Sequence, residues 1–377
     1  MSVDEFPQAD RIEGAAHPRQ TLQLFGQAEA ERIFLQAFNA GRLHHGWLLT
    51  GPNGVGKATL AWKIARFLLS QPVSQDAGMD MFGEAPIQPS DLEIDSDHPI
   101  HGAVVALSAP GLFLLRRPYD QERKRLKQDI TIDELRTLKA FLALSSPDGR
   151  RRVVIIDSVD ELNISAANAV LKMLEEPPEN TIILLISHQP ARLLPTIRSR
   201  CHELRCVPLE PDDMARALAA AGLVEVENVD RVAALSSGSV GAALQMTLSD
   251  GLGIYAQIIE LAQGFPNMDR MRALKLADRS AGSGAESHFR LTVELLDIFL
   301  SRLAKAGIGF VSQEAAAGEF EQLARLSPDA GSARVWAQLA AGLTERARRG
   351  RSVNLDPSSL VLDLLLAINE TAGRTAA

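Results

Sequence analysis

The sequence has 377 residues, 46% of them hydrophobic, and a formal net charge of -8. A chain of this size can bury the cores of roughly two or three domains, which excludes a chain disordered throughout. The acidic balance argues against a protein that coats nucleic acid by bulk charge, so any contact with DNA would need a local basic patch.

Cysteine content and hydropathy indicate the compartment. Two cysteines in so long a chain do not form a disulfide framework and fit a reducing cytosol. The opening residues, MSVDEFPQADRIEG, are acidic and hold no apolar core of signal-peptide length. The most apolar late stretch, LVLDLLLAI, is short and contains Asp363. We therefore expect a cytoplasmic protein that does not engage a membrane.

The first predicted elements lead into a glycine-rich loop. Residues 28–40 have the apolar spacing of an amphipathic helix, and GWLLT at 46–50 is a short buried strand. GPNGVGKATL follows, and the sequence then continues with helical periodicity. Strand, glycine loop and helix in this order are the setting of the phosphate-binding pattern GxxxxGK[ST].

The loop meets that pattern incompletely. Gly51, Gly54 and Gly56 would supply its bends around a phosphate, and Lys57 would supply positive charge toward the outer phosphates. The last position, which should offer a hydroxyl to magnesium, is Ala58. The sequence therefore predicts a degenerate nucleotide site.

The next stretch, residues 71–128, is interpreted as a less regular insertion. It contains the charged run QERKRLK at 121–127, which is interpreted as a solvated helix face, although contact with DNA stays open. A helix is predicted to begin at Thr131, because Thr131 and Glu134 have capping-box spacing.

Two more buried strands follow, RRVVIID at 151–157 and TIILLIS at 181–187. Helical sequence separates them, which is typical of a parallel sheet with crossover helices. The intervening helix should end at Pro177 and Pro178. After residue 208 the strands stop and the pattern is helical to the end of the sequence.

The end of the 151–157 strand also departs from a working ATPase. Asp157 can hold a magnesium-bound water, but Ser158 follows where such enzymes keep a glutamate base. Thr59 lies one position late in the glycine loop and points about 100° further round its helix. Asp160 and Glu161 are interpreted as the exposed start of the next helix.

Residues 155–201, IIDSVDELNISAANAVLKMLEEPPENTIILLISHQPARLLPTIRSRC, resemble the AAA+ clamp-loader family, which shares the acidic strand, an AANALLKxLEEPP helix and an IxSRC segment. LFGQ at 24–27 and NLDPSSLVLDLLLAI at 354–368 extend the likeness toward both ends. The resemblance implies an α/β AAA+ P-loop domain over 1–208, with a parallel sheet and flanking helices. It also implies a small helical lid domain over 209–248 and an all-α collar domain over 249–377.

The resemblance also implies roles for single residues. Arg200 would be a trans arginine finger that contacts the terminal phosphate held by a neighbouring ATPase subunit. Ser187 stands at the family's polar sensor position, and Gly241 stands where active members place a nucleotide-contacting arginine. Together with Ala58 and Ser158, the loss at Gly241 implies a subunit that is not selected for hydrolysis.

No metal site is predicted. His44, His45, Cys201 and Cys206 lack companion ligands at metal spacing and are interpreted as boundary residues and buried thiols. Active members of the family usually carry four zinc-binding cysteines in the insertion, whereas this insertion has none. We therefore expect no zinc and no required cofactor, while residual binding of ATP or ADP stays open.

The implied partners are gamma/tau and delta subunits in a hetero-oligomeric ring, and through that ring the sliding clamp and primed DNA. The chain would be a subunit of the DNA polymerase III assembly and not an enzyme alone. Two alternatives stay open. In the first, the chain is itself a self-sufficient ATPase in which Thr59 and Asp160 replace the lost groups. In the second, the chain belongs to a related loader that acts in DNA recombination or repair.

Overall fold

The computed structural model describes residues 6–71, 88–95, 97–143, 151–280, 285–310 and 313–375. The chain divides into two compact units, Met1–Ala217 with Gly238–Gly241 and Leu218–Ser237 with Ala242–Ala377. We call them the α/β unit and the helical unit. The residues of the predicted lid, 209–248, are shared between the two units, and the predicted three-domain division stays a prediction.

The α/β unit is built on a five-stranded parallel sheet in the order β2-β5-β6-β1-β7. Its strands are β1 (Gly46–Thr50), β2 (Leu112–Arg116), β5 (Arg152–Asp157), β6 (Thr181–Ile186) and β7 (His202–Arg205). The three predicted strands are confirmed as β1, β5 and β6. The edge strands β2 and β7 were not predicted: β2 has the apolar run Leu112–Leu115 but lies within the stretch interpreted as an irregular insertion, and β7 is mostly polar and exposed.

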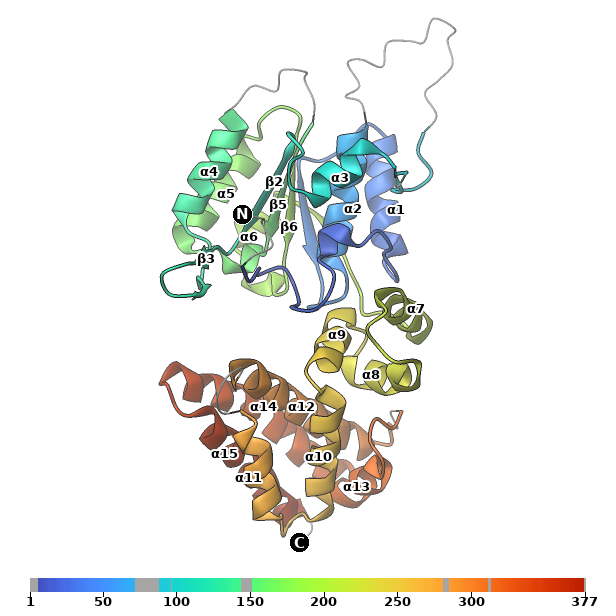
Figure 1. Cartoon of the computed structure of the whole chain (residues 1–377), viewed down its shortest axis with the longest axis vertical. Coiled ribbons are helices and arrows are strands. Elements are labelled where there is room, and N and C mark those ends of the chain that lie inside the picture. Colours follow the sequence, from blue (N-terminus) through green and yellow to red (C-terminus); the bar gives the residue numbers. More distant parts are fainter. Residues whose placement is uncertain are drawn as a thin grey trace, which may run out of the picture. The chain divides into compact units, whose positions relative to one another are not determined.

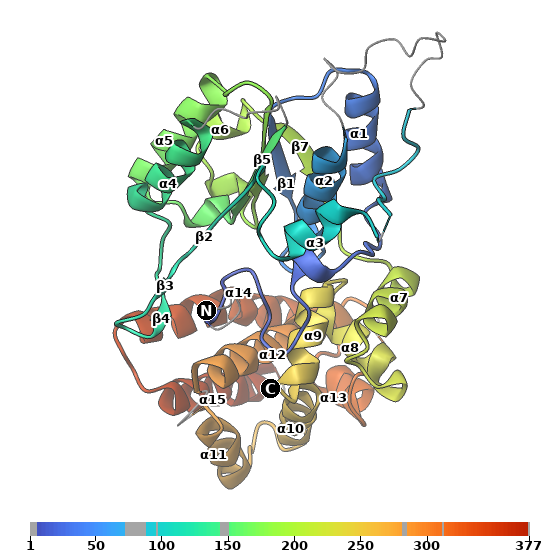
Figure 2. The same ribbon diagram turned by 45° about the horizontal axis from the view of Figure 1, so that its top comes forward.

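Helices cover both faces of the sheet (Figures 1 and 2). One face carries α4 (Ile132–Ala143) and α5 (Ile164–Glu175). The other face carries α1 (Ala28–Asn39), α2 (Lys57–Ser70) and α3 (Pro99–Val105). Burial on both faces explains why the central strands are apolar at every position.

Local signals fix the ends of two helices as predicted. The backbone N–H and hydroxyl of Thr131 donate to the Glu134 carboxylate at 2.8 and 2.5 Å, so α4 begins there. Asn163 caps α5 by accepting a hydrogen bond from the Ala166 N–H at 2.9 Å. The helix ends at Glu175, before Pro177.

The stretch predicted to be an irregular insertion contains more structure than expected. Besides α3 and β2 it holds an antiparallel hairpin of β3 (Tyr119–Asp120) and β4 (Arg125–Leu126). The charged run 121–127 lies on this hairpin and is largely exposed to solvent. The prediction of a solvated face is confirmed, but the prediction of a helix is wrong. Shorter segments complete the unit: η1 (Pro18–Gln20), η2 (Val159–Glu161), η3 (Pro190–Arg192) and α6 (Pro195–Arg198).

The helical unit confirms the predicted all-helical pattern of the C-terminal region. It contains η4 (Val226–Asn228), α8 (Val229–Ser236), α10 (Gly251–Gln263), α11 (Arg270–Asp278), α12 (Ala285–Ala306), α13 (Glu319–Leu326), α14 (Ala330–Ser352) and α15 (Pro357–Thr375). Two further helices, α7 (Pro211–Ala221) and α9 (Val240–Leu248), carry residues of both units.

A buried polar cluster joins three elements of the helical unit. Arg302 and the Tyr255 hydroxyl both donate to Oε1 of Glu319, at 2.5 and 2.6 Å. The backbone N–H of Ala315 donates to the other carboxylate oxygen at 2.7 Å, so the buried charges are fully paired. None of the helices in the described segments is both long and apolar enough to cross a bilayer.

Candidate functional site

The carboxyl edge of the sheet brings most of the predicted site residues together. β1 ends at Thr50 and leads into residues 51–57, which we call the glycine loop; β5 ends at Asp157; and Ser187 follows β6. Parallel strands place these ends along one edge, which is where open α/β sheets bind ligands. Thr59, also predicted here, lies half-buried in the first turn of α2.

The bends of the glycine loop need glycine for steric reasons. Gly51 has a φ of 138°, and a Cβ added there would lie 2.2 Å from the Cys206 carbonyl oxygen. Gly56 has a φ of 101° and directly precedes α2. Both backbone conformations disfavour any side chain, so the fold alone requires these residues whether or not a phosphate binds.

Lys57 is turned back onto its own loop. Its ammonium group donates to the carbonyl of Gly51 at 2.8 Å and also to that of Pro52. Only 3% of the residue is exposed, and burial lowers the pKa of Lys57 to about 8 against the opposing influence of nearby groups such as Asp157. A phosphate would therefore have to displace two carbonyl acceptors to reach this charge.

The backbone of residues 239–241 covers the middle of the glycine loop. The Gly241 N–H donates to the Gly54 carbonyl at 3.0 Å, and the Ser239 hydroxyl donates to the Asn53 carbonyl at 2.9 Å. A Cβ on Gly241 would lie 2.7 Å from the Gly54 Cα. The position predicted to have lost a nucleotide-contacting arginine is thus a close contact between two backbones.

Burial makes the Asp157 carboxyl group a weaker magnesium ligand than an exposed carboxylate. The residue is 8% exposed, and burial raises its pKa to about 7, with the carboxylates of Asp10 and Glu161 adding to the rise. A carboxyl group with this pKa is about half protonated at neutral pH, whereas magnesium binds the ionised carboxylate. Because Ala58 also lacks a hydroxyl, these residues do not fit a magnesium-nucleotide complex.

The prediction that Asp160 and Glu161 form the exposed start of a helix is wrong. They are not the exposed start of a helix but belong to η2, and α5 begins only after Asn163. Asp160 accepts hydrogen bonds from the Ser187 hydroxyl at 2.7 Å and from the His188 N–H at 2.5 Å. The polar side chain at the predicted sensor position is therefore occupied within the chain. The contact joins residues 27 positions apart, and no pattern in the sequence predicts it.

Residues 6–20, which we call the N-terminal arm, add an acidic group that the sequence analysis missed. The Asp10 side chain is fully buried, pairs with Nη1 of Arg116 and lies 3.2 Å from Nε2 of His17. Since His17 Nδ1 accepts from the Arg19 N–H at 3.0 Å, the ring proton of neutral His17 is on Nε2, facing Asp10.

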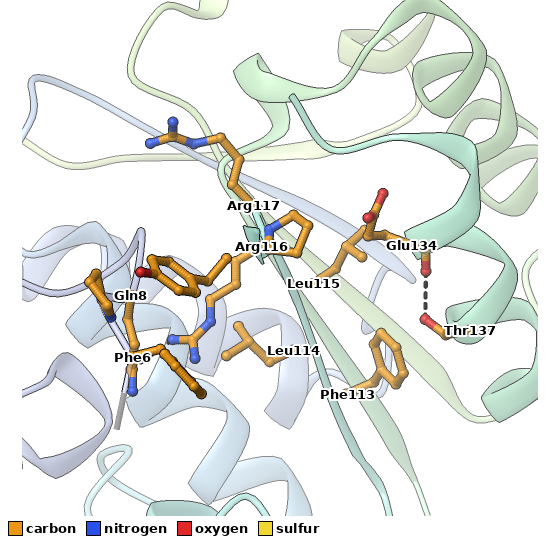
Figure 3. Close-up of a pocket in the computed structure, with 12 residues that line it drawn as sticks. Phe6, Gln8, Phe113, Leu114, Leu115, Arg116, Arg117, Glu134 and Thr137 are labelled. Atoms are coloured by element: carbon orange, nitrogen blue, oxygen red, sulfur yellow. Dashed lines mark hydrogen bonds between the residues drawn. The ribbon is translucent and has the colours of Figure 1, made fainter. Parts of the chain in front are cut away.

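The arm reaches the sheet at its open edge strand. Arg116 ends β2 in register with Asp157, and it also donates to Gln8 at 2.9 Å. Figure 3 shows the Arg116 side chain leaving β2 toward Gln8, on the opposite side of the strand from Glu134. A cavity of about 320 Å³ lies along β2 here, and none of the predicted site residues lines it.

Arg200 lies at the other edge of the sheet. It sits between α6 and β7, just before the amino end of β7. Its side chain is 37% exposed, and Nη2 lies 3.0 Å from Oε1 of Glu175. Nη1 donates to the Thr196 carbonyl at 3.1 Å and to the Ser199 hydroxyl at 3.4 Å. The sequence did not predict the ion pair between Glu175 and Arg200, although Glu175 lies within the quoted LEEPP string.

The histidines and cysteines have structural surroundings. The rings of His44 and His45 stack at 4.3 Å, and His45 Nε2 lies 2.9 Å from the Leu174 carbonyl oxygen. Burial raises the pKa of Cys201 to about 12 and that of Cys206 to about 11, so both thiols stay protonated. Over the part of the chain that the structure describes, no group of three metal-ligating side chains occurs.

Comparison with known proteins supports the resemblance found in the sequence. Residues 26–210 match the family described as DNA polymerase III, delta subunit. The DNA polymerase III subunit delta' of Pseudomonas aeruginosa is 34% identical over 222 residues, which are 58% of this chain and 60% of that protein. The subunit delta' of Escherichia coli is 28% identical over 57% of this chain and 58% of that protein.

Other matches include gamma/tau subunits. DNA polymerase III subunit gamma/tau of Mycobacterium tuberculosis is 30% identical over 54% of this chain and 31% of that protein. These three matches therefore span between 31% and 60% of the length of the relatives. A solved gamma subunit-related protein of Thermotoga maritima aligns over 90% of this chain and 99% of its own, at 17% identity and a TM-score of 0.42.

The family match begins just before α1 and ends just after β7, so it contains all five strands of the parallel sheet together with the glycine loop. The AAA+ clamp-loader resemblance predicted from the sequence is confirmed over residues 26–210, where the chain is similar to the family described as DNA polymerase III, delta subunit.

Proposed function

We propose that the chain is a delta-prime-type subunit of the DNA polymerase III clamp loader that does not hydrolyse ATP itself. In this role it lends Arg200 to the nucleotide of a neighbouring ATPase subunit. The observation that carries the proposal is the placement of Arg200 and the glycine loop at opposite edges of one parallel sheet.

The separation follows from β1. The Arg200 carbonyl oxygen would lie 3.2 Å from a Cβ on Gly46, where β1 begins, and the glycine loop starts where β1 ends at Thr50. Five extended residues place these ends about 13 Å apart. An arginine at the amino edge cannot serve a phosphate held at the carboxyl edge, so the phosphate that it meets belongs to another chain.

The state of the glycine loop supports a non-hydrolysing role. Lys57 is engaged by loop carbonyls, Gly54 is covered by Gly241, and the pKa of Asp157 is raised to about 7. The proposed role requires no cofactor, and we propose that the chain binds no zinc. Residual binding of ATP or ADP would require the loop to give up these internal contacts.

The proposed partners follow from the relatives, which are named as subunits of DNA polymerase III. We propose a ring with gamma/tau and delta subunits, held by the helical unit as the collar, that places the sliding clamp on primed DNA in the cytoplasm. The AAA+ sheet is kept as the scaffold that presents Arg200 across the subunit boundary.

The test is ATP turnover by the reconstituted ring. Arg200→Ala should lower turnover by roughly tenfold or more, since an arginine finger stabilises the charge of the transferring phosphoryl group. Arg198→Ala, an exposed arginine on the preceding helix, is the matched control and should leave turnover unchanged. Full turnover of an assembled Arg200→Ala ring would contradict the proposal.

The alternative of a self-sufficient ATPase uses Asp160 as a replacement group, but Asp160 is held by Ser187 and His188. ATP turnover by the isolated chain distinguishes this alternative, because our proposal expects none above background. Co-purification with candidate ring subunits separates the replicative loader from a recombination or repair loader.

A further inference from the structure

We propose that Glu175 is a positioning residue for Arg200, holding the guanidinium group in place until it meets the terminal phosphate of the neighbouring subunit. This inference rests on the proposed function of Arg200. It adds a residue on a different element, the last residue of α5, to the working unit at the amino edge of the sheet.

The contacts hold the guanidinium group from two sides. Glu175 Oε1 lies 3.0 Å from Nη2 in an ion pair, while the Thr196 carbonyl and the Ser199 hydroxyl accept hydrogen bonds from Nη1 at 3.1 and 3.4 Å. A long arginine side chain loses considerable rotamer freedom when it is fixed. Fixing it beforehand within one subunit lowers the cost of aligning it with a phosphate on another.

The backbone on both sides of this ion pair is itself fixed. A Cβ on Gly46 would lie 2.8 Å from the Leu174 Cδ2 and 3.2 Å from the Arg200 carbonyl oxygen, so both segments converge on the start of β1. His45 Nε2 contacts the Leu174 carbonyl oxygen at 2.9 Å. The end of α5 therefore cannot swing away from Arg200 without breaking contacts to the sheet.

Helix stability does not explain a carboxylate at this position. The C-terminus of a helix carries partial negative charge, and acidic side chains there are unfavourable. Glu175 is the last residue of α5 and Glu176 is its C-cap, so two acidic groups stand at that end. An arginine partner offsets this repulsion for Glu175.

The pair is also exchangeable, as a positioning contact must be. The Arg200 and Glu175 side chains are 37% and 41% exposed, so water and a competing phosphate can reach them. A guanidinium group carries more N–H donors than these contacts use, so it can meet a phosphate oxygen while Glu175 still holds it. A fully buried pair would be closed to a phosphate from another chain.

The experiment measures ATP turnover of the reconstituted ring with Glu175→Ala, Arg200→Ala and the double variant. We expect Glu175→Ala to lower the maximal rate about two- to fivefold, the range of a half-exposed ion pair, with little change in the KM for ATP. The double variant should match Arg200→Ala alone, because Glu175 acts only through Arg200. Glu175→Gln keeps an acceptor oxygen and should recover most of the loss.

Glu176→Ala is the matched control, since it removes the adjacent exposed carboxylate, and it should leave turnover unchanged. If Glu175→Ala does not assemble, Glu175→Asp decides, because the shorter side chain cannot keep the 3.0 Å contact and turnover should still fall.

The outcomes separate the two proposals. An Arg200→Ala ring with full turnover overturns the proposed function and this inference with it. A strong effect of Arg200→Ala combined with no effect of Glu175→Ala overturns this inference alone. The same holds if Glu175→Ala lowers turnover further in the Arg200→Ala background, because Glu175 would then act without Arg200.

Discussion

The two edges of the parallel sheet differ in how their polar groups are used. At the carboxyl edge, Lys57 is bound by its own loop, Ser187 by Asp160, and the pKa of Asp157 is raised by burial. At the amino edge, Arg200 is 37% exposed and held by a partner that water can reach. One edge has closed on itself while the other stays available to a second molecule. A fold can therefore keep its architecture for the sake of one edge after the other has stopped binding.

The glycine loop is held by contacts within the chain, so we expect its glycines to stabilise the folded protein even when no nucleotide is bound. Gly51→Ala should lower the free energy of unfolding by about 3 kcal/mol or more, because the Cβ would meet a backbone carbonyl at positive φ. Urea unfolding of the isolated chain measures this. Gly102→Ala, in α3 with no atom within 4 Å of the new Cβ, is the control and should be neutral or slightly stabilising.

A stable Gly51→Ala variant would show that the loop backbone can relax. In that case the tight contact with Cys206 does not hold the loop closed, and the contrast between the two edges would be weaker than described.

The N-terminal arm offers a second test of the carboxyl edge, because Asp10 pairs there with Arg116 at the end of β2. Asp10→Ala should destabilise the chain by about 2–3 kcal/mol, because it leaves the partly buried Arg116 and the buried His17 without their carboxylate. Glu13→Ala, an exposed change in the same arm, is the control. Equal unfolding midpoints for the two variants would mean that the arm is not anchored through Asp10.

Asp157 gives a pH test with a definite sign. The pKa of Asp157 is about 7 in the folded protein against an ordinary value of 3.8, so its contribution to stability is fully present below about pH 4 and is lost as pH rises through 7. Asp157→Asn removes this loss and should raise the free energy of unfolding at pH 8 by about 1–3 kcal/mol.

Unfolding curves between pH 4 and 8 measure the effect as a flatter pH dependence in the variant. Asp133→Asn, in an exposed pair with Arg136, should change little and serves as the control. Destabilisation by Asp157→Asn at pH 8 would indicate that the carboxylate is charged and needed in the fold.

The parts of the fold that the sequence predicted rest on local signals. The central strands are continuous apolar runs, the glycine loop has fixed spacing, and the Thr131–Glu134 contact spans one helical turn. The edge strand β7 was not predicted because its sequence is mostly polar, and β2 was not predicted because its apolar run lies within the stretch interpreted as an irregular insertion. The family resemblance, carried by the RSRC string, supplied Arg200.

The remainder of the site depends on tertiary contacts that no local pattern encodes. Asp10 pairs with Arg116, which lies 106 positions later in the sequence, and Asp160 accepts a hydrogen bond from Ser187, which lies 27 positions later. The Gly241 N–H donates to the Gly54 carbonyl, although Gly241 follows the last strand of the sheet. Asp160 was misread because an acidic residue before a helix usually faces water. Only the folded sheet brings these partners together.

The most direct test of the contrast compares Arg200→Ala with Lys57→Met in the same reconstituted ring, with ATP turnover as the readout. We predict a loss of roughly tenfold or more for Arg200→Ala and turnover within about twofold of wild type for Lys57→Met. The reverse pattern, full turnover without Arg200 and a large loss without Lys57, would contradict the account.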